Sequence, residues 1–426
     1  MTGAVSADVV VIGGGLIGLA IAWQSANQGL DVHLIDPDPG RGASNVAAGM
    51  LAPVMEVTYG EQDHLTLTIA GARAWPAFAA ELGAATGRDV GYRATGTLLV
   101  GYDADDAAAL ADLEAFQTEL GLEVTRLRGR ELREREPLLS PRVRTGLLAG
   151  EDHRVEPRAV VAALLTAARD AGVHLDDGRV TRLDHDGSRV DGVTLEDGRR
   201  IAAAQVVLAA GAWSATIDGL PDTARPAVRP LKGQLLQLRA LDGRQVLTTT
   251  VRALVRHRSL YLVPRDDGRL VVGASQEERG FDTTVTAGAT RELLDDAAAI
   301  VPGIDELELT ETIAGLRPTT PDNAPVIGPT AALEGLVLAT GHHRNGALLT
   351  ALTARTVTDI LTGQAPDPVL AAADPDRANL RRHRVDGTHR DGTGDADRSG
   401  TASDRDGRGA GLDALLAANR GHGRRG

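Results

Sequence analysis

The chain has 426 residues, of which 42% are hydrophobic and 24% are charged, and its formal net charge is −13. A chain of this length holds roughly two or three domains, and its acidic balance disfavours nucleic acid as the main partner. The absence of cysteine excludes disulfides, thiolate nucleophiles and cysteine-ligated metals. No apolar run of about 18 residues occurs, so we expect no membrane span. The N-terminus lacks a basic region before its first strand, which argues against a signal peptide and favours the cytoplasm.

The first predicted unit is a strand, a helix and a second strand, at residues 9–12, 16–28 and 31–36. Gly13, Gly15 and Gly18 form the pattern GxGxxG at the turn between the first strand and the helix. The first glycine permits a sharp turn, the second lets the backbone approach a pyrophosphate, and the third allows close packing of helix on strand. The helix N-terminus offers free N–H groups to the phosphates. The unit therefore predicts a dinucleotide site.

The continuation of the chain favours FAD over a nicotinamide nucleotide. Asp36 ends the second strand, near the spacing expected for an acid that accepts hydrogen bonds from an adenosine ribose. The segment GRGASNVAAGMLAP, residues 40–53, is too rich in small residues for a core helix, and it would let backbone amides crowd against a long ligand. A nicotinamide enzyme would be expected to continue with an ordinary helix and a third parallel strand. A surface loop, or a glycine-rich turn without a ligand, remains the alternative.

Helices and strands alternate through the middle of the chain. Helices are predicted at residues 65–82, 104–121 and 128–140, within 153–175, and at 289–300. Strands are predicted after the helix within 153–175, at residues 95–103, as short strands within 179–201, and at 204–211, 229–238, 259–275 and 306–318. Residues 334–363 predict a strand, a glycine-rich turn and a long helix. Over 371–426 the composition shifts to Arg, Asp, Gly, Ser and Thr, and we expect a mostly disordered tail.

Two features near the C-terminal end predict an anion site. Asn345 and Gly346 begin the last helix, whose positive end can face an anion. Arg317 stands in ETIAGLRPTTPDNAPVIG, residues 311–328, which is otherwise small, apolar or turn-forming. A buried cation needs an anion or many acceptors, because its desolvation alone costs several kcal/mol. Either Asp322 or another carboxylate of the protein balances Arg317, or the anion comes from outside.

Three segments together resemble the D-amino-acid oxidase superfamily of FAD-dependent amine oxidases, and within it the glycine oxidases of thiamine biosynthesis. They are VVVIGGGLIGLAIAWQ, GASNVAAGMLAP, and the pair AGLRPTTPDNAPVIG with GHHRNGALLTALTA. The first is shared by many flavoproteins, whereas the other two, in this order and spacing, are specific to this branch. The resemblance covers residues 8–365.

The resemblance implies an α/β fold of two domains. A discontinuous, Rossmann-like FAD-binding domain is interrupted by an α+β substrate domain, whose antiparallel sheet covers the flavin. We place the FAD-binding domain at residues 1–85, 150–225 and 320–370. The substrate domain then takes residues 86–149 and 226–319.

The resemblance also assigns site residues. Arg317 matches the arginine that holds the substrate carboxylate, Tyr261 matches an assisting tyrosine of the covering sheet, and Arg344 matches an arginine close to flavin and substrate. A core tyrosine, an Arg317–Asp322 pair and a structural Arg344 remain the alternatives. Val180 corresponds to the strand residue whose backbone meets the adenine. The residues expected to bind the cofactor are Gly13, Gly14, Gly15, Ile17, Gly18, Asp36, Ala43, Ser44, Ala47, Ala48, Gly49, Met50, Val180, Gly211, His342, His343, Arg344, Asn345, Gly346, Ala347 and Leu348.

The activity that the resemblance implies is oxidative deamination of glycine or a similar small amine. Hydride would pass to flavin N5, leaving an imine for thiamine thiazole synthesis, and dioxygen would reoxidise the flavin and yield hydrogen peroxide. The amides of Asn345, Gly346 and Ala347 would stabilise negative charge near flavin N1. No side chain is assigned as catalytic and no metal is expected. Hydride transfer from a neutral amine needs no protein base, so His342 and His343 receive no such role.

The closest alternative is an enzyme of the same superfamily that acts on D-amino acids or sarcosine, either as an oxidase or as a dehydrogenase. A dehydrogenase would pass its electrons to a carrier. Further alternatives are a protein that uses FAD structurally, a nicotinamide-sensing module and an FAD enzyme acting on tRNA. Gln276 and Glu277 are polar where the pocket rim should lie, so side-chain specificity does not transfer from the family. The oligomeric state is left open, with a homo-oligomer as one outcome.

Overall fold

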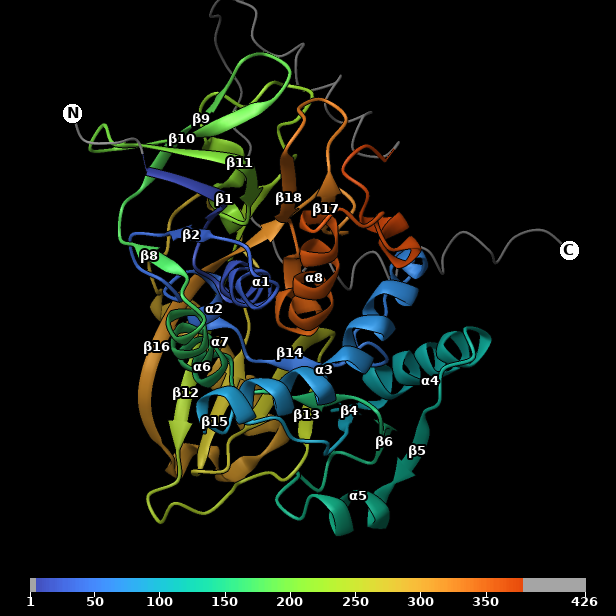
Figure 1. Ribbon diagram of the computed structural model, residues 1–426. Helices are drawn as coiled ribbons and strands as arrows, with labels where there is room; N and C mark the ends of the chain where they lie inside the picture. Colours follow the sequence, from blue (N-terminus) through green and yellow to red (C-terminus); the bar gives the residue numbers. More distant parts are fainter. Residues whose placement is uncertain (1–4, 378–426) are drawn as a thin grey trace, which may run out of the picture.

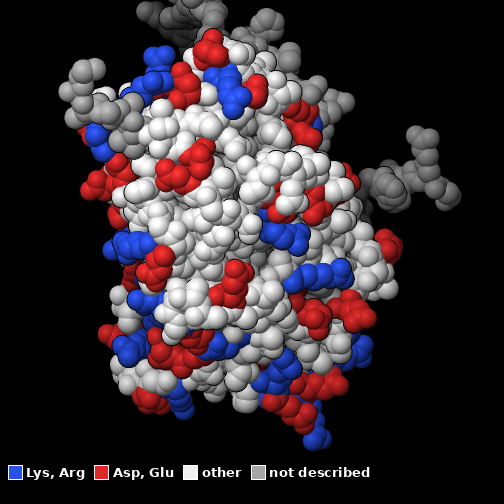
Figure 2. All heavy atoms as spheres, viewed as in Figure 1, with Lys and Arg blue, Asp and Glu red and all other residues white. Residues whose placement is uncertain are grey.

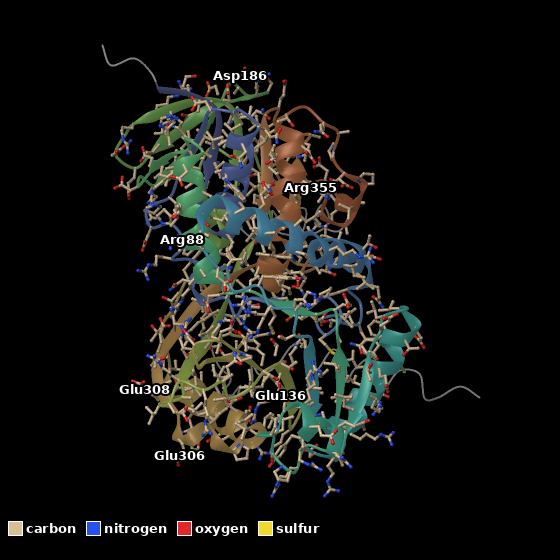
Figure 3. The ribbon with its side chains drawn as sticks, turned by 60° about the horizontal axis from the view of Figure 1, so that its bottom comes forward. Arg88, Glu136, Asp186, Glu306, Glu308 and Arg355 are labelled. Carbon is tan, nitrogen blue, oxygen red and sulfur yellow. The ribbon has the colours of Figure 1, made fainter. Side chains whose placement is uncertain are left out.

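The computed structural model describes residues 5–377. These residues form two bodies, each built around one eight-stranded sheet, and the two bodies lie one above the other in Figure 1. Figure 3 shows the same division, with Asp186 at the end of one body and Glu306 and Glu308 at the end of the other.

The first sheet has the strand order β17–β18–β11–β1–β2–β8, and the pair β9–β10 is attached to β11. Its strands are β1 (Val5–Ile12), β2 (Val32–Ile35), β8 (His174–Asp176), β9 (Val180–His185), β10 (Val190–Leu195), β11 (Arg200–Leu208), β17 (Val326–Pro329) and β18 (Leu336–Thr340). β1 pairs in parallel with both β2 and β11, and β11 pairs in parallel with β18. Val9, Val10 and Val11 are fully buried, as expected of a central parallel strand covered on both faces.

Four helices share one apolar core with this sheet: α1 (Leu16–Asn27), α3 (Leu65–Thr86), α6 (Pro157–Asp170) and α8 (Gly346–Leu361). A second apolar cluster lies under β9 and β10 and includes Leu183 and Val193. Local sequence sets the helix ends. α6 begins at Pro157, where the missing N–H would have had no partner, and α3 is followed by Gly87 in the left-handed conformation with φ +66°.

The second sheet has the order β16–β12–β15–β14–β13–β4–β6–β5. Its strands are β4 (Thr97–Gly101), β5 (Thr125–Arg128), β6 (Thr145–Ala149), β12 (Arg229–Arg239), β13 (Thr250–Val255), β14 (Arg258–Pro264), β15 (Arg269–Gly273) and β16 (Glu308–Thr319). The neighbours pair antiparallel except for β13 and β4, which run parallel. Leu293, Ala297 and Ile300 of α7 (Ala287–Ile300) pack on one face. Leu110 of α4 (Ala104–Glu119) packs with Leu99 and Leu147 on the other.

Shorter elements complete the chain. They are α2 (Ala43–Val46), α5 (Gly129–Arg135), β3 (Met50–Leu51), β7 (His153–Arg154) and 3₁₀ turns η1 (Gln62–His64), η2 (Gly211–Thr216), η3 (Pro302–Glu306), η4 (His343–Asn345) and η5 (Pro368–Ala373). β3 and β7 pair with each other as a separate two-stranded sheet.

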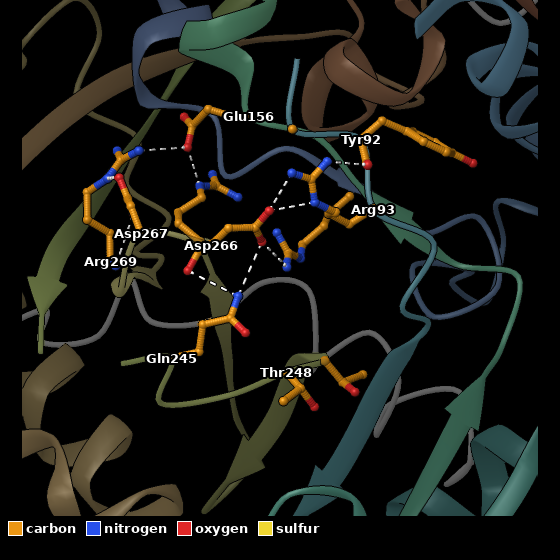
Figure 4. A network of polar contacts seen from close by, with 12 residues as sticks. Tyr92, Arg93, Glu156, Gln245, Thr248, Asp266, Asp267 and Arg269 are labelled. Carbon is orange, nitrogen blue, oxygen red and sulfur yellow. Dashed lines mark hydrogen bonds and ion pairs between the residues drawn. The ribbon is translucent and has the colours of Figure 1, made fainter. Parts of the chain in front are cut away.

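A polar network fixes the turn between β14 and β15 to the first body. Arg265, in this turn, forms an ion pair of 2.5 Å with Glu156 just before α6, and it donates to the carbonyl of Ala48 at 2.7 Å. Figure 4 shows the surrounding pairs Arg93–Asp266, Gln245–Asp266 and Arg269–Glu156. The network therefore couples the second sheet to the small-residue segment that contains Ala48.

The predicted α/β fold, with a Rossmann-like parallel sheet and a second, largely antiparallel sheet, is confirmed. The first sheet takes its strands from residues 5–35, 174–208 and 326–340, and the second from residues 97–149 and 229–319. The sequence did not predict β3, β5, β6, β7, β13 or β17. The helix predicted at residues 128–140 is shorter than expected and ends at Arg135, because Pro137 disfavours helical geometry in the residue before it.

Part of the predicted tail is folded. The structure describes residues 371–377 of it, in which Ala373 is fully buried and Arg377 donates to both oxygens of Asp322 at 2.9 Å. These residues belong to the first body. The rest of the predicted tail, residues 378–426, lies outside the described residues.

The surface matches the acidic, mixed composition. Figure 2 shows basic and acidic side chains interspersed over one face of the molecule, without a large patch of one sign. Within residues 5–377, none of the helices has the length and apolar character that a membrane crossing requires.

Candidate active site

A cavity of about 1820 Å³ lies between the two sheets. Pockets for small ligands usually measure about 300–1,000 Å³, so this cavity has room for a dinucleotide and a small substrate together. Most of the residues assigned from the sequence line it: Gly13, Gly15, Ile17, Asp36, Ala43, Ser44, Ala47, Ala48, Gly49, Met50, Val180, Gly211, Tyr261, Arg317, His342, His343, Arg344, Gly346 and Ala347.

Gly14, Gly18, Asn345 and Leu348 do not line this cavity. Gly14 and Gly18 shape the glycine turn from behind it, and Asn345 lines a small neighbouring pocket. The Leu348 side chain is 1% exposed and belongs to the apolar core of the helices. Any contact of Leu348 with a cofactor is therefore restricted to its backbone.

The glycine turn after β1 has no room for side chains. Gly13 has φ +108°, and a Cβ there would lie 2.5 Å from the carbonyl oxygen of Ala209. A Cβ on Gly18 would lie 1.9 Å from the oxygen of Gly13, so Gly18 lets α1 pack directly on the turn. At the start of α1, the amide of Leu16 donates to the hydroxyl of Ser44 at 3.0 Å. The turn and the helix N-terminus thus form a backbone surface of the kind that binds phosphate.

Asp36 closes this turn from the end of β2. One of its carboxylate oxygens accepts from the amide of Gly14 at 2.6 Å, and the other accepts from the amide of Asp38 at 2.8 Å. Each carboxylate oxygen has a further lone pair, so Asp36 can still accept hydrogen bonds from ribose hydroxyls in the cavity.

The small-residue segment at residues 43–50 is pressed between the two bodies. Gly49 has φ +81°, and a Cβ there would lie 2.2 Å from the oxygen of Val155 in the first body. On the other side, a Cβ on Gly315 of β16 would lie 2.8 Å from Val46. Only the single turn α2 is helical here, which agrees with the expectation that the segment is not a core helix.

The N-terminus of α8 faces the cavity through Gly346 and Ala347. Asn345 precedes the helix and its side chain makes no capping hydrogen bond. The first-turn N–H groups have no partner within the helix, so this end carries partial positive charge toward the cavity.

The two histidines before α8 are neutral. Burial lowers the pKa of His342 to about 3, and its Nε2 lies 3.2 Å from the hydroxyl of Thr353. Burial, and then the charges of Arg344 and Arg317, lower the pKa of His343 well below its usual value, and its Nδ1 lies 2.9 Å from the hydroxyl of Thr319. Groups whose pKa is lowered in this way are weak bases, so neither His342 nor His343 is suited to accept a proton from the substrate.

Arg317 enters the cavity from β16 and is half-buried. Its guanidinium lies over Gly233 of β12, where a Cβ would come within 2.4 Å of one of its nitrogens. The same guanidinium donates to the carbonyls of Ser275 at 3.2 Å and Lys232 at 3.5 Å. These acceptors are neutral, so the positive charge of Arg317 is oriented but not balanced.

The alternative in which Asp322 balances Arg317 is wrong. Asp322 binds Arg377 through two hydrogen bonds of 2.9 Å. Among the described residues, Arg317 forms no ion pair with a carboxylate. The remaining possibility from the sequence, an anion that comes from outside the protein, is therefore the one that fits the geometry.

Tyr261 faces the same cavity from β14. Its ring lies over Gly273 of β15, where a Cβ would be 2.3 Å from the phenol oxygen. Burial raises the pKa of the Tyr261 hydroxyl, and the nearby Arg317 opposes this shift. Tyr261 therefore stays protonated as a hydrogen-bond donor. Glycines on two neighbouring strands leave the space in which Arg317 and Tyr261 lie.

Arg344 has a partner within the protein. It forms an ion pair with Glu61, whose carboxylate also accepts from the side chain of Asn323 at 2.8 Å. Arg344 also donates to the hydroxyl of Thr58 at 3.2 Å and to the carbonyl of Glu56 at 3.3 Å. It lines the cavity, but its charge is balanced, and its assignment to substrate stays a prediction.

Sequence reasoning missed a second ion pair in the cavity, between Arg252 of β13 and Glu56 at 3.5 Å. The segment that carries Glu56 is held by the fully buried Asp152, which accepts from the amides of Val54 at 3.1 Å and Met55 at 2.9 Å. Burial raises the pKa of Asp152 to about 7. Nothing in the sequence indicates this ion pair, because Arg252 and Glu56 lie far apart in the chain and β13 was not predicted.

Lys232 was also missed as a supporting residue. It is the only lysine of the chain, it is 1% exposed, and it binds Asp282 at 3.1 Å and Glu277 at 3.6 Å. Glu277 accepts further hydrogen bonds from Ser275 and Gln234, both at 2.6 Å. The network fixes the segment after β15, and with it the carbonyls that orient the cavity arginine on β16.

These features fit an FAD. The glycine turn leaves space that side chains would fill, Asp36 borders the cavity at the end of β2, and most residues of segment 43–50 are small. The helix ends of α1 and α8 both supply N–H groups along the cavity wall.

Comparisons with known proteins agree with this geometry. The model of the family described as FAD dependent oxidoreductase, DAO, matches residues 8–360. The chain is 34% identical over 359 residues to a glycine oxidase of Geobacillus kaustophilus, a match that covers 83% of this chain and 92% of that protein. A crystal structure of glycine oxidase from the same organism matches with a TM-score of 0.79 at 33% identity, covering 87% of this chain and 99% of that one.

A longer relative matches over part of its length. The chain is 33% identical over 372 residues to a bifunctional protein ThiO/ThiG of Trichormus variabilis. The match covers 85% of this chain and 54% of that protein. The chain therefore spans about half the length of this relative.

Proposed function

This chain belongs to the DAO family of FAD-dependent oxidoreductases, and we propose that it oxidises the amino group of glycine or a similarly small amino acid. The likeness to proteins named glycine oxidase and ThiO/ThiG supports this substrate class and a supply of imine to thiamine thiazole synthesis. In the same proposal dioxygen is the electron acceptor, hydrogen peroxide is the product, and the enzyme works in the cytoplasm.

The observation that carries the proposal is the unbalanced guanidinium of Arg317 in the cavity. A planar guanidinium fits a carboxylate through two parallel hydrogen bonds. The Tyr261 hydroxyl, protonated and beside it, can donate to the same carboxylate. An α-amino acid bound in this way presents its amine and α-carbon to the rest of the cavity.

In this proposal the remaining assigned site residues bind the cofactor, and the end of a helix sets the electrostatic field around it. Bound FAD supplies the two-electron oxidation. The glycine turn and Asp36 hold its pyrophosphate and ribose, Val180 and Gly211 line the same wall, and the N-terminus of α8 favours negative charge on the side of Gly346. The chain contributes position and electrostatics rather than a proton acceptor.

The division of labour between the two bodies is part of the proposal. Residues 1–85, 150–225 and 320–370 would hold FAD, and residues 86–149 and 226–319 would hold the substrate. The second sheet then covers the substrate, because the face of it that carries Arg317 and Tyr261 borders the cavity.

An anaerobic substrate screen tests the function. Purified FAD-loaded protein is mixed with glycine, sarcosine and D-alanine, and the flavin absorbance is followed. Bleaching with glycine, and peroxide formation on admitting air, are the expected results. Bleaching without peroxide, together with rapid dye reduction, would instead indicate a dehydrogenase. A flavin that no amine bleaches would contradict the proposal.

A further inference from the structure

Two histidines and an aspartate meet at the edge of the first sheet, away from the cavity. His33 of β2 and His174 of β8 are partners in the parallel register, and their ring centroids are 4.4 Å apart. Asp31 precedes β2, with one carboxylate oxygen 3.6 Å from Nε2 of His174. His33 is buried, whereas His174 and Asp31 are exposed. We propose that Asp31, His33 and His174 form a binding site for a divalent transition-metal ion of the zinc class.

The spacing of the three groups is close to that of a metal site. One ligand atom from each of the three residues can be chosen so that all of them lie within 4.8 Å of one another. Bond lengths of about 2.0–2.2 Å in a tetrahedral site place neighbouring ligand atoms roughly 3.3–3.5 Å apart. The 3.6 Å separation of Asp31 and His174 nearly meets this condition. The remaining separations, at most 4.8 Å, would have to shorten to this spacing when an ion binds.

The ligand types select the ion. Two imidazoles with one carboxylate suit zinc, copper, nickel or cobalt, whereas calcium and magnesium prefer oxygen ligands alone. The three protein ligands leave one tetrahedral position for water, which the exposed side of the site can supply. Within residues 5–377 this is the one group of three such side chains with metal-site spacing.

The neighbouring carboxylates have other partners. Asp8 accepts from the amide of Asp31 at 2.9 Å. Asp176, two residues after His174, is paired with Arg199 at 2.5 Å. The carboxylate of Asp31 makes no hydrogen bond in the described residues and its ion pair is with His174 alone, so it is available to an ion.

A bound ion would brace the edge of the sheet. β8 contains only residues His174–Asp176 and is held by its pairing with β2. The carbonyl of Asp176 accepts from the amide of Asp36 at 3.0 Å, and Asp36 closes the glycine turn. An ion that joins His33 to His174 therefore links the outer strand to the strand that carries Asp36.

The test is a titration of tag-free, FAD-loaded full-length protein with Zn²⁺, followed by calorimetry and by thermal unfolding. His174→Asn is the decisive variant, because this side chain is exposed and its loss leaves the core intact. We expect its zinc affinity to fall at least about tenfold, and Asp31→Asn to behave similarly. Zinc should raise the unfolding temperature of the parent and not of His174→Asn. The matched control is His185→Asn on β9, which should bind zinc as the parent does.

Zinc binding at other histidines is separated from the proposed site by comparing the variants with the parent. His383, His389 and His422 lie in the C-terminal part of the chain and can bind zinc in the parent and in every variant, so the difference between His174→Asn and the parent is the readout. Cu²⁺ electron paramagnetic resonance of the oxidised protein gives a second readout, since two imidazole nitrogens should couple in the parent and one in the variant. Equal zinc affinity and equal thermal stabilisation in the parent and His174→Asn would overturn the proposal.

Discussion

Two arginines of the second body differ in whether the protein supplies an anion that balances their charge. Arg265 is 4% exposed and is balanced within the protein, by an ion pair of 2.5 Å with Glu156 and a hydrogen bond of 2.7 Å to Ala48. Arg317 is half-buried and donates only to neutral acceptors, such as the carbonyl of Ser275 at 3.2 Å. The first arginine joins the two bodies, and the second faces the cavity between them.

The difference teaches how to separate a structural arginine from a binding arginine. Both guanidinium groups are at least partly withdrawn from water, and the degree of burial does not by itself show which of them binds a ligand. The distinction lies in whether the protein supplies a carboxylate. For Arg317 the candidate from the sequence, Asp322, is already taken by Arg377. A charge that the fold orients but does not balance is best explained by a ligand of opposite charge.

The largest effect is expected from Arg265→Met. It would leave the carboxylate of Glu156 without its closest partner, and breaking a buried pair costs about 3–5 kcal/mol of unfolding free energy. Arg269 lies 3.3 Å from the same carboxylate and would offset part of the loss. Urea denaturation of the FAD-loaded protein measures the change. Arg41→Met, at a side chain that is 68% exposed, is the matched control and should change stability little; equal stability of both variants would contradict the structural role.

The second prediction disturbs Arg317 without removing it. A Cβ at position 233 would come within 2.4 Å of its guanidinium, so Gly233→Ala should displace it. A displacement of about 1 Å can lower kcat/KM by about 100-fold. Steady-state kinetics with glycine checks this. Gly303→Ala is the control, because no atom lies within 4 Å of a Cβ there, and normal activity of Gly233→Ala would show that the position of Arg317 is unimportant.

The third prediction concerns a buried group that stays uncharged. The pKa of His342 is lowered from 6.5 to about 3 when the protein folds. Below pH 6.5 the unfolded chain binds a proton that the folded chain does not. This contribution to stability is therefore present above pH 6.5 and is lost as the pH falls towards 3, by about 1.4 kcal/mol per pH unit. His342→Gln should flatten the dependence of unfolding free energy on pH in this window, and an unchanged slope would refute the neutral assignment.

The smallest effect is expected from Glu277→Gln, which weakens the support of Arg317 and leaves its charge in place. Lys232 keeps its contact of 3.1 Å with Asp282, so the loss should be about 1 kcal/mol. We expect a several-fold rise in KM for glycine with little change in kcat. Glu278→Gln, on the same segment but 63% exposed, is the control. A fall in kcat with unchanged KM would show that Glu277 does not act through Arg317.

Most of the fold could be predicted from local sequence patterns. The unit around Gly13, Gly15 and Gly18 was predicted because the strand, turn and helix are consecutive in the chain, and the last helix was placed at Gly346 for the same reason. β13 was missed, since TVRALV mixes charge and apolar residues without a regular alternation. Its partners, β4 and β14, lie before and after it, and only the fold brings all three together.

Site residues could be predicted where the neighbours in sequence reveal them. They could not be predicted where their role depends on an ion pair with a distant residue. Arg317 stood out because its neighbours in sequence are apolar or turn-forming. The pairing of Arg344 with Glu61, and of Arg252 with Glu56, joins residues separated by 283 and by almost 200 positions. No local pattern encodes such contacts, because they depend on how segments far apart in the chain pack together in the fold.

The most direct test of the account compares two substrates in two proteins. The value of kcat/KM is measured for glycine and for glycinamide, which lacks the carboxylate, in the parent and in Arg317→Met. The account predicts that the substitution costs about 2–5 kcal/mol with glycine, leaves glycinamide nearly unchanged and leaves FAD content normal. An equal loss with both substrates, or no loss with glycine, would contradict the claim that Arg317 binds the substrate carboxylate.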